Sequence, residues 1–301
     1  MTVASGGGAP YVYSLASGTL PTGLTLSPQG VLSGTPTATG SYNFNVSVTG
    51  ACVSSGSQAF SLVIAPKAVT ATFAAVTKAY NGDAVANIVF NPLDAGSGVV
   101  APDVINVTYT SAAYNTAGVG INKPVTLTGL ALTGANSASY TLNPVVVTGT
   151  ITAAPIVPSL VLPITKVYDG NTTATLTGAN YSFTGKVGTE DVALNNPATG
   201  NYALKDVGNR LVSVTGLTLT GTDAANYTLS TTSISATGTI NQAIITPVLA
   251  GTITKVYDGN TTAALTGANY SFTGKVGTDD VSLNNPATGN YALKDVGNRL
   301  V

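Results

Sequence analysis

The chain contains one long stretch twice, almost letter for letter. Residues 164–212 read ITKVYDGNTTATLTGANYSFTGKVGTEDVALNNPATGNYALKDVGNRLV, and residues 253–301 repeat this stretch with three substitutions. The substitutions replace Thr175 by Ala264, Glu190 by Asp279 and Ala193 by Ser282. Repetition at this period predicts a tandem array of small modules, each just large enough to bury a core of its own.

A third, more diverged copy lies upstream. Its KAYNGD at residues 78–83 matches KVYDGN at 166–171, and its TLTGLALTG at 126–134 matches SVTGLTLTG at 213–221. Short linkers containing Pro or Gln separate the copies, so we predict four modules, at residues 1–66, 67–153, 154–242 and 243–301. Because nothing after Val301 matches residues 213–240, the last module is predicted to be incomplete.

The composition excludes several classes of protein. Charged residues are only 8% of the chain and the net charge is −1, so no basic patch is available to hold nucleic acid. Apolar residues make up 44%, which is enough for a packed core. Cys52 is the single cysteine, so an intrachain disulfide is excluded. No run of 18 apolar residues is present, so no membrane span is expected within this sequence.

Apolar and polar residues alternate with a period of two in almost every segment. In residues 42–48, Tyr42, Phe44, Val46 and Val48 share one face, and the intervening residues are Asn or Ser. Turn signals such as Asn81-Gly82 and Asp169-Gly170 recur every 8 to 12 residues or so. Gly129 and Gly216 interrupt otherwise good strands and predict a bulge or a bend there. The pattern predicts an all-β fold of Ig-like, antiparallel β-sandwich modules arranged as an elongated rod.

No catalytic constellation is visible in the sequence. Histidine is absent, which excludes a Ser-His-Asp or Cys-His arrangement and an ordinary zinc site. The best approximation to a phosphate-binding loop, Gly178 to Lys186, has the wrong glycine spacing and lacks the Ser or Thr that must follow the lysine. We therefore expect a protein that is not an enzyme and that needs no cofactor.

Two sets of polar and aromatic residues could bind a ligand. Loop carboxylates could gather calcium at a module junction, or they could stabilise turns through bonds to the backbone. These acids are Asp169, Glu190, Asp191, Asp206 and Asp223. Tyrosines could line a sugar-binding face, or they could cap the core with the hydroxyl at its edge. The candidates for that face are Tyr168, Tyr181 and Tyr202.

Two regions resemble known families. The strings GGAPY, LPTGLTL and GVLSGTPTATGSYNFNV, within residues 7–46, resemble the Ig-like modules of large bacterial surface proteins. Residues 67–301 resemble the YDG-type repeats of long, filamentous-haemagglutinin-like adhesins, through KVYDGNTTA at 166–174, KDVGN at 205–209 and TGLTLTGTDAANYTL at 215–229. The first copy departs from this pattern, with Asn81 in place of Asp and no KDVGN string. The resemblance implies a stalk or adhesive array that is secreted or held on a bacterial cell surface.

One lysine recurs at the same place before each turn. Lys78, Lys166 and Lys255 could each form an intramolecular cross-link with a neighbouring Asn or Asp, as lysines do in some surface Ig-like domains, or could simply cover the core with their stems.

Three functions follow from this reading. The first is a non-catalytic stalk or attachment array, whose partners are neighbouring modules and a host or environmental glycan or protein. The second is a filament subunit in which the incomplete last module is completed by a strand from another copy. The third is a carbohydrate-binding module, which would need the tyrosine face.

Overall fold

The computed structural model describes residues 8–52 and 55–301, so residues 1–7 and 53–54 of the predicted Ig-like module lie outside it. The described chain is built from β-strands and single turns of 3-10 helix, which confirms the all-β prediction. It divides into two compact units, Met1–Thr152 and Ala153–Val301. Among the described residues, no helix is long and apolar enough to cross a membrane.

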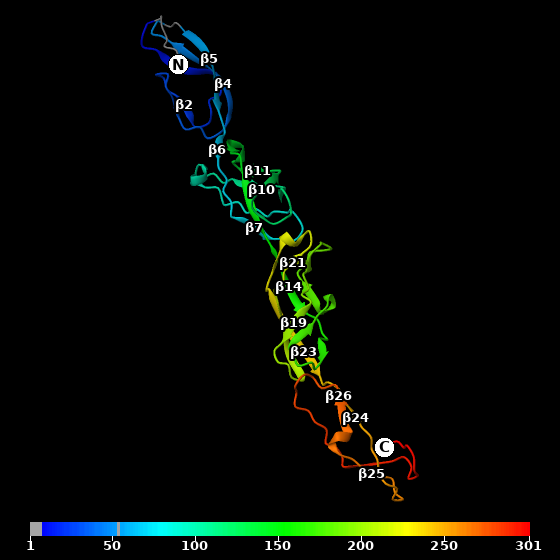
Figure 1. Cartoon of the computed structure of the whole chain (residues 1–301). Helices are drawn as coiled ribbons and strands as arrows, with labels where there is room; N and C mark the ends of the chain where they lie inside the picture. The colour runs from blue at the N-terminus through cyan, green and yellow to red at the C-terminus, as the bar shows by residue number, and fades with distance from the viewer. Residues whose placement is uncertain (1–7, 53–54) are drawn as a thin grey trace. The chain divides into compact units, whose positions relative to one another are not determined.

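The N-terminal module consists of a three-stranded antiparallel sheet and a hairpin (Figure 1). Its sheet has the order β1-β4-β5 and its hairpin joins β2 to β3. The strands are β1 (Val12–Gly18), β2 (Leu24–Leu26), β3 (Leu32–Gly34), β4 (Gly40–Thr49) and β5 (Ser55–Ile64). Phe44 and Val46 are 5% and 4% exposed, as the alternation in β4 predicts, and the Phe44 ring stacks on Phe60 of β5.

The first repeat, predicted at residues 67–153, contains a four-stranded sheet of order β7-β13-β10-β9 and two short two-stranded sheets, β11-β8 and β12-β6. Val69, Val99, Ile105 and Tyr140 form a buried cluster. Its elements are β6 (Lys67–Val69), β7 (Val76–Ala79), η1 (Ala95–Ser97), β8 (Asn106–Thr108), β9 (Ser111–Tyr114), β10 (Gly120–Thr128), β11 (Ala131–Thr133), η2 (Ser137–Ser139), β12 (Tyr140–Leu142) and β13 (Val147–Thr152).

The second repeat, predicted at residues 154–242, contains a five-stranded sheet of order β15-β23-β20-β19-β16, a three-stranded sheet β17-β14-β22 and the pair β18-β21. Its core includes Ile164, Tyr202, Val212 and Ile240. Its elements are β14 (Ala154–Leu160), β15 (Thr165–Val167), β16 (Thr173–Thr175), η3 (Gly178–Asn180), β17 (Tyr181–Thr184), β18 (Ala193–Leu194), β19 (Thr199–Tyr202), β20 (Gly208–Thr215), β21 (Leu219–Thr220), η4 (Ala224–Asn226), β22 (Tyr227–Leu229) and β23 (Ser233–Asn241).

The third repeat, predicted at residues 243–301, has two two-stranded sheets, β24-β26 and β25-β27. Ala263 and Leu265 are its buried apolar residues. Its elements are β24 (Thr246–Leu249), β25 (Thr262–Ala264), η5 (Gly267–Asn269), β26 (Tyr270–Thr273) and β27 (Thr288–Asn290).

Strand direction in the repeats differs in part from the antiparallel expectation. In the second repeat, β15 pairs with β23 in parallel, and β14 pairs with β22 in the same way. The first repeat has the same two parallel pairs, β7 with β13 and β6 with β12. Parallel neighbours need a long connection, and here nearly the whole repeat lies between the two strands. Antiparallel β20 then binds the other edge of β23 over eight residue pairs, from Gly208↔Ile240 to Thr215↔Ser233.

The predicted bends are present. Gly129 follows β10 directly with a φ of 62°, and Gly216 follows β20 with a φ of 75°. Both angles lie in the left-handed region that glycine adopts without a steric penalty. The chain therefore leaves the large sheet at equal places in the first and second repeats.

Candidate functional site

The ammonium group of Lys166 lies in a cage of oxygen atoms at the end of β15. Its Nζ is 2.5 Å from Asp169 Oδ1. It donates to the main-chain oxygen of Asn171 at 3.0 Å, to Asn171 Oδ1 at 3.0 Å and to the Thr173 carbonyl at 3.1 Å. The lysine side chain is only 12% exposed. We call residues 166–173 the lysine-bound turn.

Two side chains give this turn its shape. The Asn171 amide donates to Asp169 Oδ1 at 3.2 Å, and the Thr173 amide donates to Asn171 Oδ1 at 2.8 Å. Side chains of Asp and Asn that accept from the backbone two residues later form turns of this kind. Between the two acceptors, Gly170 has a φ of 78°. Together these bonds direct the oxygens of residues 171 and 173 towards the lysine.

The same turn is present in all three repeats. In the third repeat, Lys255 Nζ lies 2.6 Å from Asp258 Oδ1 and binds Asn260 and the Thr262 carbonyl. In the first repeat, Lys78 Nζ binds Asp83 Oδ1 at 2.5 Å, the Asp83 carbonyl at 2.9 Å and the Val85 carbonyl at 3.2 Å. The equivalent lysines predicted from the sequence therefore share one structural environment.

In each turn the lysine lowers the pKa of the aspartate that it binds. The hydrogen bond from Lys166 is the largest cause that holds the pKa of Asp169 below its usual value of 3.8. Lys78 lowers the pKa of Asp83 and Lys255 that of Asp258 in the same way. The Lys166 Nζ lies 5.8 Å from the centre of the Tyr202 ring, and Lys255 Nζ lies 5.9 Å from that of Tyr291. Both distances suit a cation–π contact.

These surroundings bear on the cross-link hypothesis. The structure places Lys166 beside Asn171 and Asp169, the kinds of residue that such a bond needs. A lysine that attacks an amide must have a free electron pair on Nζ, whereas Lys166 Nζ acts as a hydrogen-bond donor to the oxygen atoms around it. The geometry thus supports a non-covalent role for Lys78, Lys166 and Lys255, and the cross-link stays a prediction.

The three tyrosines of the predicted ligand face do not share an open surface. Tyr202 is only 2% exposed, so its place in that face is corrected. Its hydroxyl donates to the Ile164 carbonyl at 3.3 Å, because Tyr202 packs in the core between β15 and β23. Tyr181 and Tyr168 pack against the edge of the same core. The Tyr181 hydroxyl donates to the Pro197 carbonyl at 2.5 Å.

Three of the five candidate calcium ligands are occupied within turns. Asp191 Oδ2 accepts from the Thr222 amide at 2.9 Å, which is the largest cause of the lowered pKa of Asp191. Asp223 Oδ2 accepts from the Asp191 amide at 2.8 Å. Asp169 belongs to the lysine-bound turn, and Asp206 is an exposed loop residue. In the part of the chain that the structure describes, no three acidic, Cys or His side chains form a metal-binding group.

A tyrosine–carboxylate pair recurs that the sequence reasoning missed. Tyr140 donates to Asp103 Oδ2 at 2.7 Å, and the Val100 amide donates to the Tyr140 hydroxyl at 3.0 Å. In the second repeat, Tyr227 donates to Glu190 and accepts from the Val187 amide. The two residues are 37 positions apart in both repeats, and that shared spacing was the available signal.

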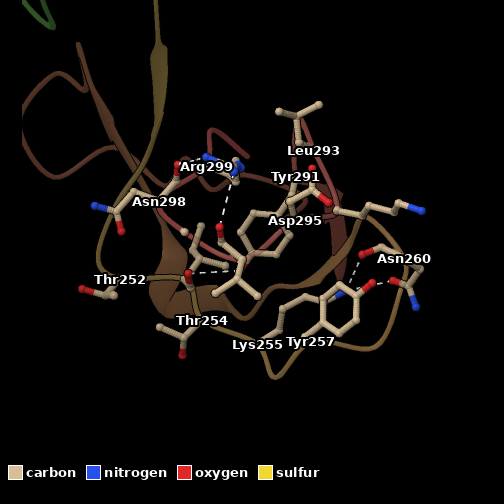
Figure 2. Close-up of a pocket in the computed structure, with 14 residues that line it drawn as sticks. Thr252, Thr254, Lys255, Tyr257, Asn260, Tyr291, Leu293, Asp295, Asn298 and Arg299 are labelled. Atoms are coloured by element: carbon tan, nitrogen blue, oxygen red, sulfur yellow. Dashed lines mark hydrogen bonds between the residues drawn. The ribbon is translucent and has the colours of Figure 1, made fainter.

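A cavity of ≈ 370 Å³ opens in the third repeat. Its lining includes Ile253, Lys255, Tyr291 and Arg299, and Figure 2 shows the Tyr291 ring among them. In the second repeat β23 occupies the equivalent place, where Gly238 passes so close to Tyr202 that an added Cβ would lie 2.9 Å from its ring. The cavity therefore has the position of a β-strand.

Comparison with protein families agrees with this architecture. The model described as "YDG domain" matches residues 65–148, 152–234 and 241–301. The chain belongs to the YDG domain family. A second model, described as "Putative Ig domain", matches residues 1–65. The YDG repeats thus follow an Ig-like module, and the lysine-bound turn is built on their Tyr-Asp-Gly sequence or on its Tyr-Asn-Gly variant.

Individual known proteins give no assignment beyond the family. No curated protein matches the chain. Among solved structures, a protocadherin gammaB7 EC3-6 cis-dimer structure is similar, with 11% identity over 81% of this chain and 70% of that chain and a TM-score of 0.22. A score that low carries no functional argument.

Proposed function

We propose that this chain is a non-catalytic structural and adhesive part of a long repeat protein, secreted by or held on the surface of a bacterium. The observation that supports this most directly is the lysine-bound turn, built around an equivalent lysine and carboxylate in three successive repeats. An array of repeats gains length and surface with each copy. Near-identity between repeats suits projection and attachment, since a reaction centre would be needed only once.

The proposed partners are neighbouring modules and a glycan or protein on another surface. To test location, intact producing cells are treated with an external protease and probed with an antibody against this chain. Loss of the signal without lysis supports the proposal. A signal that is protected in intact cells and cleaved only after lysis overturns the surface location.

Attachment needs a separate test. Beads that carry the whole chain are compared with beads that carry a scrambled-sequence control for retention on glycan and host-protein arrays under flow. Selective retention supports adhesion. If the chain is retained no better than the control on every surface, the adhesive part of the proposal is wrong and the structural part remains.

A filament subunit is the second candidate, and the cavity of the third repeat favours it. The edge at Thr254–Val256 corresponds to β15, which in the second repeat pairs with β23. A strand with the sequence of β23 from another copy would fit between this edge and residues 297–301.

A synthetic peptide with the sequence of residues 233–241, SISATGTIN, tests the filament candidate. We expect the peptide to bind the chain and to prevent association seen by light scattering. The same peptide with Val in place of the glycine is the control, because a side chain there would clash with Tyr291 as it would with Tyr202 in the second repeat. A chain that is monomeric at all concentrations and binds neither peptide excludes strand complementation.

A further inference from the structure

The six residues KVYDGN occur in identical form in the second and third repeats but have different surroundings. In the third repeat Tyr257 is 59% exposed, and a Cβ added to Gly259 would have no atom within 4 Å. In the second repeat Tyr168 and Gly170 are half-buried. A Cβ on Gly170 would lie 3.2 Å from Val276 Cγ1, in the third repeat. The sequence is the same, so the difference comes from what covers the turn.

A polar interaction joins the same two segments. The carboxylate of Asp279 is the largest cause that raises the pKa of Tyr168, and burial and the charges of Asp279, Asp206 and Asp169 act in the same direction. The Asp279 amide in turn donates to the Val276 carbonyl at 3.2 Å. Residues 276–279 therefore form a small turn, which we call the acidic loop, with Val276 facing Gly170 and Asp279 facing Tyr168.

The residue types on the two sides of this contact are suited to close packing and to polar contact. Glycine at position 170 lets the acidic loop approach the backbone closely, and tyrosine offers an apolar ring with a polar tip. Asp279 takes the place of Glu190, whose carboxylate accepts a hydrogen bond from Tyr227 of its own repeat. Within its own repeat, by contrast, the ammonium cage takes its side chains from Lys166, Asp169 and Asn171.

We propose that the Tyr-Asp-Gly turn of the second repeat is the docking surface for the acidic loop of the third repeat, so that Tyr168 and Gly170 form the joint with Val276 and Asp279. The Lys, Asp and Asn of the motif build the turn, while its Tyr and Gly contact the repeat that follows. The exposed face of Tyr257 and Gly259 is a docking surface of the same kind, and its partner is the acidic loop of another YDG repeat. This inference rests on the proposed role as a tandem array.

The two identical motifs allow a matched test in the whole chain. Spin labels are attached at Ser182→Cys and Ser271→Cys, two exposed strand positions on either side of the joint, with Cys52→Ser to remove the native thiol. We expect Tyr168→Phe to broaden the distribution of distances between the labels. Asp279→Ala should broaden it equally, and combining both changes should add nothing. Tyr257→Phe, which alters the exposed copy, should leave the distribution unchanged.

A glycine pair gives a second, independent readout. Gly170 and Gly259 have φ angles of 78° and 77°, so alanine strains the backbone equally at both positions. Only Gly170→Ala also meets Val276, and we expect it to broaden the distance distribution and to lower the unfolding temperature more than Gly259→Ala does. Equal effects from the two alanine variants, or no broadening from Tyr168→Phe, would overturn the proposal. Protease accessibility and bead retention report on the array function separately, so failure of the joint and failure of that function give different results.

Discussion

Asp83 of the first repeat and Asn171 of the second occupy the same place, although one is an acid and the other an amide. Each accepts from its lysine through both the main-chain carbonyl and Oδ1, at 2.9 and 2.5 Å for Asp83 and at 3.0 and 3.0 Å for Asn171. Two positions earlier the chemistry is exchanged, with Asn81 in the first repeat and Asp169 in the second. The turn thus holds one carboxylate and one amide, and either order satisfies the lysine.

This exchange predicts how substitutions in the second repeat behave. Asp169→Asn leaves the Lys166 ammonium without a carboxylate and should destabilise the turn by about 1 kcal/mol or less, since the carboxylate is half exposed. Adding Asn171→Asp recreates the order of the first repeat and should restore most of the loss. Hydrogen exchange of the Thr173 amide measures both effects. A double variant that exchanges as fast as the single one contradicts the interchangeability.

The lysine-bound turns also predict a loss of stability in acid. Because the pKa values of Asp83, Asp169 and Asp258 are lower in the folded chain than the usual 3.8, the unfolded chain binds their protons first. Their contribution is fully present above about pH 4 and disappears as the pH falls through the folded values.

We therefore expect the urea midpoint to fall between pH 6 and pH 3. The fall should be smaller in a variant with Asn at all three positions. Asp206→Asn, at an exposed loop carboxylate, controls for the loss of a negative charge. Equal acid sensitivity in the triple variant and the parent would show that other groups are responsible.

Gly238 is predicted to be intolerant of any side chain. Gly238 lies on β23, which is paired on both sides in the large sheet, and an added Cβ would lie 2.8 Å from the Ile164 carbonyl oxygen and 2.9 Å from Tyr202 Cε1. Gly238→Ala should lower the stability of the second repeat by roughly 1–3 kcal/mol, the usual cost of overpacking. Denaturant unfolding followed by tyrosine fluorescence measures it. Gly178→Ala is the control, because its Cβ would meet only Asn196 Nδ2, at 3.7 Å; similar losses in both variants would refute the close-approach argument.

The intact mass of the chain reports on the cross-link hypothesis. Lys166 Nζ is engaged as a hydrogen-bond donor by the oxygen cage, so we expect the mass to equal that of the sequence. A bond between Lys166 and Asn171 would release one ammonia molecule and lower the mass accordingly. Mass spectrometry of the purified chain distinguishes the two. A deficit that disappears in Lys166→Met would establish the covalent bond and refute our non-covalent reading.

Much of the architecture was accessible from the sequence. The near-identical copies predicted a tandem array, and the alternation in residues 42–48 predicted a strand whose inner face Phe44 and Val46 occupy. Gly129 and Gly216 marked real bends. These features are local or repetitive, so the amino-acid pattern carries them directly.

The local amino-acid pattern did not predict strand direction or the partners of residues far apart in the chain. Alternation is the same for parallel and antiparallel strands, so it could not show that β15 and β23 run in parallel. Tyr202 seemed available to a ligand because its burial depends on β23, which follows it by more than 30 residues. The pair Tyr140–Asp103 joins residues 37 positions apart, and no local pattern connects them.

The sequence by itself thus determined the repeating all-β design and the composition of the lysine-bound turn, because repetition, alternation and turn chemistry act over a few residues. The tertiary structure decided which oxygens surround each lysine, which tyrosines are buried and which repeat covers the turn of Tyr168. Those outcomes depend on segments far apart in the chain that meet only when the sheets close.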